Sequence, residues 1–95
     1  MSGSEPSLKC VIAWSERRSL CTLVAEAIEM KMGAEEVRRL GDDAVAVYSA
    51  EEPSEIRDWL GTLLAGDESA LVFEFERWSS CGPGVDNAWL MQRGH

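Results

Sequence analysis

Apolar residues recur along this chain with two spacings, every second position in some segments and every third or fourth in others. Residues 8–14 (LKCVIAW) are apolar on both alternating sides except at Lys9, which predicts a strand in the middle of a sheet. After the polar turn at 41–43, residues 44–49 (AVAVYS) predict a second short, largely buried strand.

Residues 70–78 (ALVFEFERW) also alternate with period two, with leucine and phenylalanine on one side and Glu74 and Glu76 on the other. We expect a half-buried strand whose glutamates lie on the sheet face opposite the helices. Two carboxylates at this spacing point the same way and could serve a metal or acid–base chemistry. A solvated face with a salt bridge to Lys9 is the simpler interpretation.

The first helical stripe spans residues 20–28, with Ser15 as a candidate N-cap and Gly33 as the stop signal. The following segment, 34–40, fits either an extension of that helix or a short edge strand. We prefer the strand, because it would form a hairpin with the next one.

The second helical stripe spans residues 56–64, follows Pro53 in a first-turn position, and is expected to end at Gly66. Acidic residues gather around its start, where they favour the helix dipole and could also meet a basic partner. These residues are Glu51, Glu52, Glu55 and Asp58.

The two ends of the chain differ in character. Residues 1–7 are rich in serine, glycine and proline, which predicts a disordered lead. Residues 79–95 are expected to form an extension that packs on the domain. Trp78, Trp89 and Leu90 lie outside the clear periodic pattern, and tryptophan is enriched where partners dock. The alternative is that these rings seal the open sheet face.

The order strand, helix, strand, strand, helix, strand predicts one α+β domain over residues 8–78. Right-handed crossovers would give a ferredoxin-like βαββαβ fold, a four-stranded antiparallel sheet with both helices on one face. We expect residues 15–17 to share one rim with 51–52, and 42–43 to share the other with 67–68.

The net charge of the chain limits the classes of molecule that it is expected to bind. With 17 acidic against 9 basic residues, the net charge of −8 repels phosphate backbones and anionic lipids. We therefore expect no direct nucleic-acid binding and no membrane binding. The first residues lack the basic and apolar regions of a signal peptide, so a cytoplasmic location is expected.

Catalytic chemistry has little support in these residues. His95 is the single histidine and ends the chain, so we predict neither a catalytic residue nor a metal ligand set, and no cofactor. Cys10, Cys21 and Cys81 are too widely spaced for a zinc site and are expected to stay reduced. Cys81, before a Gly-Pro-Gly turn, could be a reactive thiol, although an ordinary turn cysteine is the simpler interpretation.

The leading hypothesis is a non-catalytic, acidic protein-interaction module that binds a protein partner, for example one with a basic surface, or a second copy of itself. One alternative is an inhibitor that mimics nucleic acid in the basic groove of a target protein. Another is a small-ligand sensor or small enzyme in which Arg17 and Arg18 hold a carboxylate or phosphate.

Overall fold

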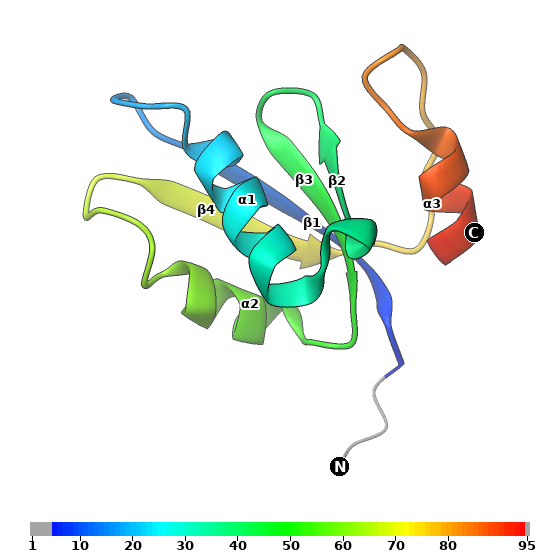
Figure 1. Cartoon of the computed structure of the whole chain (residues 1–95), viewed down its shortest axis with the longest axis horizontal. Coiled ribbons are helices and arrows are strands. Elements are labelled where there is room, and N and C mark those ends of the chain that lie inside the picture. Colours follow the sequence, from blue (N-terminus) through cyan, green and yellow to red (C-terminus); the bar gives the residue numbers. More distant parts are fainter. Residues whose placement is uncertain (1–4, 95) are drawn as a thin grey trace.

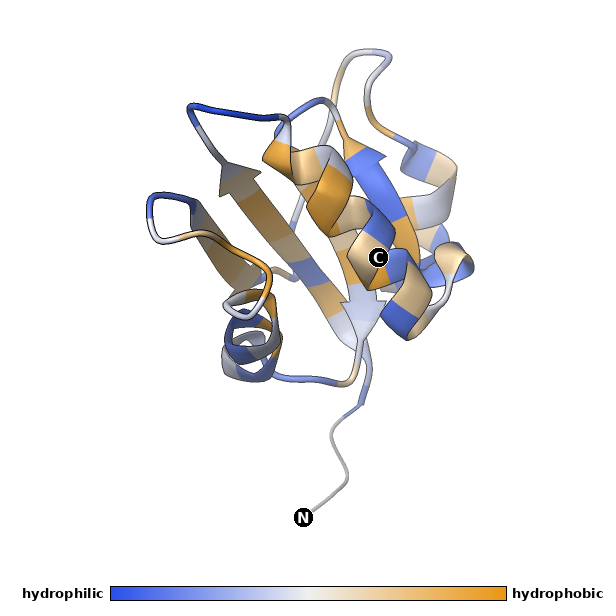
Figure 2. Ribbon diagram, turned by 60° about the vertical axis from the view of Figure 1, so that its left-hand side comes forward, coloured by the Kyte–Doolittle hydropathy of each residue, from blue (hydrophilic) through white to orange (hydrophobic). Residues whose placement is uncertain are grey.

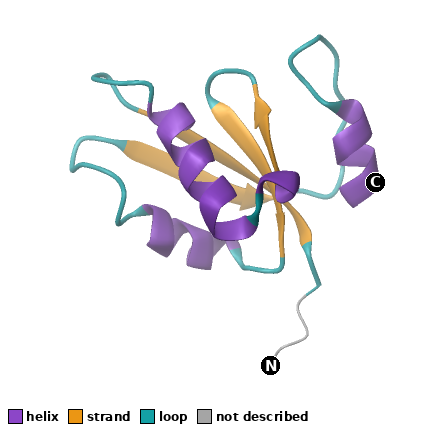
Figure 3. Cartoon of the chain, in the orientation of Figure 1, coloured by secondary structure: helices purple, strands orange, loops and turns teal. Residues whose placement is uncertain are grey.

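A computed structural model describes residues 5–94, in which four strands and three α-helices follow one another as β1-α1-β2-β3-α2-β4-α3 (Figure 1). The strands are β1 (Ser7–Trp14), β2 (Val37–Leu40), β3 (Ala44–Ser49) and β4 (Ser69–Glu74). The helices are α1 (Leu20–Met32), α2 (Pro53–Leu60) and α3 (Asn87–Gly94), with a short 3-10 turn, η1 (Ala34–Glu36), before β2. Figure 3 shows these elements by type.

The strands form one antiparallel sheet in the order β2-β3-β1-β4. Val11 in β1 lies opposite Val45 of β3 and Val72 of β4. The prediction of a central first strand is confirmed, since β1 is flanked on both sides and its side chains are buried on both faces. The hairpin between the second and third strands is also confirmed.

One face of the sheet, here called the front face, is covered by α1 and α2 (Figure 1). Side chains from both helices close over apolar residues of all four strands, and Figure 2 colours the strands beneath α1 mainly as hydrophobic. The fully buried members include Val24 and Ile28 of α1 and Ile56 of α2. Such a layer is the main source of stability in a domain of this size.

The opposite, back face is partly covered by α3. Trp89 and Leu90 of this helix are buried against Leu8 of β1 and Ala46 of β3. The chain after β4 therefore returns across the back of the sheet on the β2–β3 side.

The ends of several elements differ from the sequence predictions. The first helix begins at Leu20 instead of at Ser15, whose hydroxyl accepts a hydrogen bond from the Arg17 amide in a preceding turn. The second ends at Leu60, since the chain turns at Gly61 while Leu63 and Leu64 still pack on the core. An apolar stripe indicates which residues are buried, and residues of an irregular segment can be buried in the same way.

The segment 34–40 combines both of the shapes considered for it, a 3-10 turn over its first three residues and then the preferred strand. Ser7, which the sequence prediction places in a disordered lead over 1–7, belongs to β1 and pairs with Ser49. Residues 1–4 and His95 lie outside the described residues. Among the helices described between residues 5 and 94, none has the length and apolar character needed to cross a bilayer.

The fourth strand corrects two predictions. It ends at Glu74, short of residue 78, and its two sides are reversed. Val72 lies opposite Val11 and Glu74 opposite Lys9, so both belong to the front face. Leu71 and Phe73 project from the back face instead. A strand's register against its neighbour fixes which side faces the helices, and β4's own alternation carries no such information.

The expected pairing of rims is wrong as well. Because β1 is antiparallel to both neighbours, its end meets the starts of β3 and β4 rather than the end of β3. Arg17 accordingly contacts Asp67 at 2.9 Å instead of facing residues 51–52.

Candidate functional site

The two edges of the sheet are built differently. At one edge, β2 carries Arg38 and Arg39 in its middle, visible as the blue part of that strand in Figure 2. At the other edge, residues 69–73 of β4 carry no charged residue and no proline. Charged residues and prolines at an edge discourage pairing with another chain, so the β4 edge lacks the usual protection.

The backbone of β4 presents free hydrogen-bonding groups at this edge. The Phe75 amide donates to the Leu8 carbonyl at 3.1 Å, and alternate residues of an antiparallel strand bond to the same neighbour. The groups of Leu71 and Phe73 therefore point to β1, and those of Ala70, Val72 and Glu74 point outward. Within residues 5–94, no other strand pairs with this outer side.

Large apolar side chains lie exposed beside that edge, on the part of the back face that α3 leaves open. Trp14 is 50% exposed, Leu71 52% and Phe73 40%. The register places all three on one face, with Leu71 beside Ile12 and Phe73 beside Cys10. We call Trp14, Leu71 and Phe73 the open strip. A cluster of this kind on a domain surface typically marks an interaction site.

A cavity of about 300 Å³ lies between α2 and the β4 edge. It is lined by Pro53, Ser54, Arg57, Ala70, Leu71 and Val72. Arg57 supplies the charge of this lining, and its guanidinium bonds Asp58, the next residue, at 2.7 Å. Both partners of that pair are largely exposed, so the pair stabilises little and Arg57 can change partner at small cost.

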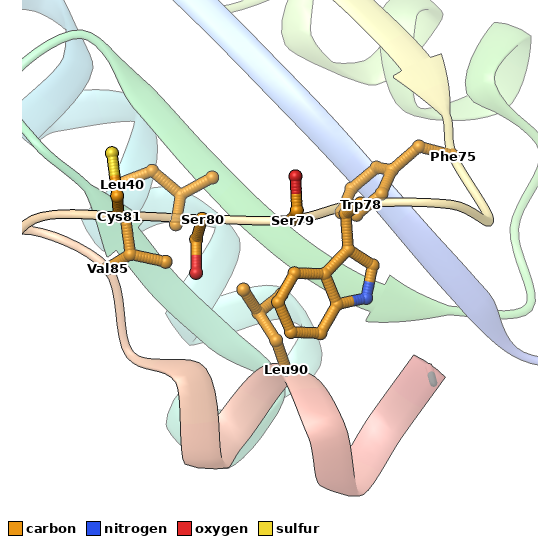
Figure 4. A pocket seen from close by; sticks show the side chains of 8 residues that line it. All are labelled: Leu40, Phe75, Trp78, Ser79, Ser80, Cys81, Val85 and Leu90. Atoms are coloured by element: carbon orange, nitrogen blue, oxygen red, sulfur yellow. The ribbon is translucent and has the colours of Figure 1, made fainter.

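A second cavity, of about 310 Å³, lies between β2 and the segment leading to α3 (Figure 4). It is lined by Leu40, Phe75, Trp78, Ser79, Ser80, Cys81, Val85 and Leu90. Trp78 is half-buried here, and Cys81 is exposed. The cavity is mainly apolar, and none of the residues that line it is charged.

Trp89, proposed from the sequence as a docking residue, lies in the interior. Its indole N–H donates to the Glu35 carbonyl at 2.7 Å, and the guanidinium groups of Arg93 and Arg38 lie 5.0 and 5.7 Å from its ring centre. Leu90 is also buried. Both residues hold α3 on the sheet, which is the alternative the sequence left open for the tail tryptophans.

Arg17 and Arg18, considered for an anionic ligand, are brought together but face the chain's own carboxylates. Arg18 donates from Nε and Nη2 to both oxygens of Glu68 at 2.6 Å. This bidentate contact, with a further bond from the Ala65 amide, lowers the pKa of Glu68 to about 2. A bound anion would have to displace a buried carboxylate from this position.

The acidic residues proposed as a partner site are dispersed. At the start of α2 the Glu55 carboxylate accepts from the Glu52 amide at 2.8 Å, as in a capping box. Asp58 pairs with Arg57, Glu51 is half-buried, and Glu76 is exposed beyond β4. The capping box of Glu52 and Glu55 stabilises the start of α2.

Glu74 lies opposite the buried Lys9, the residue to which a salt bridge was expected from the sequence, and the two are linked through Ser7. Its carboxylate accepts from the Ser7 hydroxyl, which in turn accepts from the Lys9 ammonium at 2.9 Å. Burial lowers the pKa of Lys9, and the charge of Glu74 partly opposes that shift. Within residues 5–94, no three metal-binding side chains gather at one place.

Sequence reasoning missed the open strip, because it expected both sides of residues 8–14 to be buried and the apolar side of residues 70–78 to face the helices. The alternation of side chains carried the signal. If Val11 faces the helices, the β4 residue paired with it must also face them, and the β4 residues just before and after that one must face the other side of the sheet. Comparison with protein-family models, curated proteins and solved structures finds no match to this chain.

Proposed function

We propose that this chain is a non-catalytic protein-interaction module that binds its partner through the β4 edge and the open strip. The observation that carries the proposal is the coincidence of free backbone groups at Ala70, Val72 and Glu74 with exposed large apolar side chains on the same strand. Backbone bonds along an edge supply affinity, and apolar side chains beside it supply specificity.

We also propose a ferredoxin-like fold for the domain, with α3 as an addition. The antiparallel order β2-β3-β1-β4 and the placement of α1 and α2 on one face support this grouping. Because that fold hosts many unrelated functions, it adds nothing to the functional argument, which depends on the surface alone.

Affinity capture from the native cell tests the proposal. The bait is the whole chain, and the variant Leu71→Lys/Phe73→Lys places charge on the open strip. Met30→Lys is the matched control, because Met30 is an 89% exposed apolar residue on α1, away from β4. We expect the double variant to lose partners that the wild type and the control retain.

The wild-type thermal unfolding curve must be preserved in both variants for the comparison to count. Recovery of the same proteins by the folded double variant would contradict the proposed surface. The interaction would then have to use another part of the molecule.

A further inference from the structure

We propose that the partner at this surface is a second copy of the chain, bound so that the two β4 strands pair antiparallel about a two-fold axis at Val72. The inference rests on the proposed function and names its partner. The product is a continuous sheet of about eight strands, formed from two four-stranded sheets.

Backbone parity and the length of β4 favour this register, because it pairs all three outward-pointing residues, whereas an axis at Leu71 or Phe73 would pair two. Outward-pointing groups belong to Ala70, Val72 and Glu74, and a two-fold axis at Val72 places each of them opposite another outward-pointing residue. Val72 meets Val72 of the second copy, and Ala70 meets Glu74 of the second copy. Each such pair exchanges both of its hydrogen bonds, about six in all. A shift by one residue would oppose outward groups to inward ones.

On the back face, the same register brings the open strips together. Leu71 lies opposite Phe73 of the second copy, and Phe73 opposite Leu71 of the second copy. These are non-hydrogen-bonded pairs, in which side chains approach most closely. The pairing therefore gives lateral apolar contacts to the two β4 side chains of the strip that the single chain leaves 52% and 40% exposed.

On the front face, the register supplies charge complementarity. Glu74 faces the front, so Glu74 of the second copy would stand opposite Ala70. Ala70 and Arg57 line the same cavity of about 300 Å³ beside α2, which leaves room for that carboxylate to reach the guanidinium. The symmetry repeats this Arg57–Glu74 contact, so the dimer contains it twice.

Self-association must also overcome a net charge of −8 on each copy. The paired segment 70–74 carries one charge in each copy, Glu74, which this register places near Arg57 of the other copy. The remaining repulsion comes from more distant groups, which salt screens. The paired surface is small, so we expect a weak dimer in the micromolar range that tightens as long-range repulsion is screened by moderate salt.

Sedimentation velocity over a concentration series tests the inference on the full chain. Val72→Pro removes an outward N–H and leaves the bonds to β1 intact, so this variant should stay folded and become monomeric. Arg57→Glu should raise the dissociation constant by about tenfold or more, because two contacts become repulsive. The double variant Arg57→Glu/Glu74→Arg restores opposite charges and, with its thermal unfolding curve measured beside the wild type because residue 74 neighbours the buried Lys9, should bring the constant back to within about threefold of wild type.

Three results would overturn the dimer. They are a wild-type chain that stays monomeric at hundreds of micromolar, a folded Val72→Pro variant that associates normally, and a charge-swapped double variant no tighter than Arg57→Glu. None of these results decides the proposed function. The chain could still bind a different protein through Leu71 and Phe73 without forming a dimer, and the capture experiment tests that.

Discussion

Trp89 is the residue on which the attachment of α3 most depends, and Trp89→Ala gives the sharpest test of the two-layered core. The side chain is buried, donates one hydrogen bond to Glu35, and stacks near two guanidinium groups. Removing a buried tryptophan costs about 3–5 kcal/mol. We expect most of this loss to appear as detachment of α3, because the cluster around Trp89 is separate from the one beneath α1 and α2.

Hydrogen exchange of residues 87–93 measures the detachment, and urea unfolding measures the free energy. Trp14→Ala is the control, since a half-exposed ring should cost less than half as much. Trp89→Phe keeps most of the apolar contact and loses the indole bond, so about 1–2 kcal/mol is expected. If Trp89→Ala costs under about 1 kcal/mol and leaves the α3 amides protected, the assignment of α3's stability to this ring is refuted.

Three further predictions follow from local features. The pKa of Glu68, lowered to about 2 by Arg18, lies below its unfolded value near 4.5, so folding stability should fall as pH drops through that window. Urea unfolding between pH 6 and 2 should show this loss, and Glu68→Gln should flatten it; an unchanged pH profile would contradict the assignment. Gly33 has a φ of +98°, so Gly33→Ala should destabilise by about 1–2 kcal/mol, whereas Gly66→Ala, with no positive φ and nothing within 4 Å, should be nearly neutral in the same denaturation assay. Exposed Cys81 should react with a thiol reagent at once, and the two buried cysteines, whose thiol pKa burial raises, only on unfolding. Rapid labelling of all three in the folded chain would count against the packing.

Much of the fold could be predicted because its signals are local. The alternation in β1, the apolar stripe of α1 and the Gly33 stop depend on neighbours in sequence, and the structure has them where expected. The extent of α2 was overestimated because Leu63 and Leu64 are held by packing beyond the helix end. The spacing of these two leucines predicts contact with the core, but it does not predict whether the backbone there forms helical hydrogen bonds.

The candidate surface could not be predicted because it depends on non-local pairing. Leu71 and Phe73 are more apolar than Ala70, yet their side chains lie on the open back face, because Val72 is the residue opposite Val11. For the converse reason, the sequence leaves open whether Trp89 docks a partner or seals the sheet: its burial depends on η1 and the back of the sheet, which are distant in sequence. Long-range register, and not composition, decides both outcomes.

The arginines of β2 bear on how far any edge-to-edge assembly can grow. Arg38 bonds the carbonyls of Ala34 and Val37, and Arg39 bonds Thr22 and the Asp42 carbonyl, so both cations are anchored along that border of the sheet. A filament needs two adhesive borders on every subunit. In the part of the chain described, β4 is the edge strand without such cations. Pairing of two chains through β4 therefore leaves no second adhesive edge, and the assembly is closed and finite.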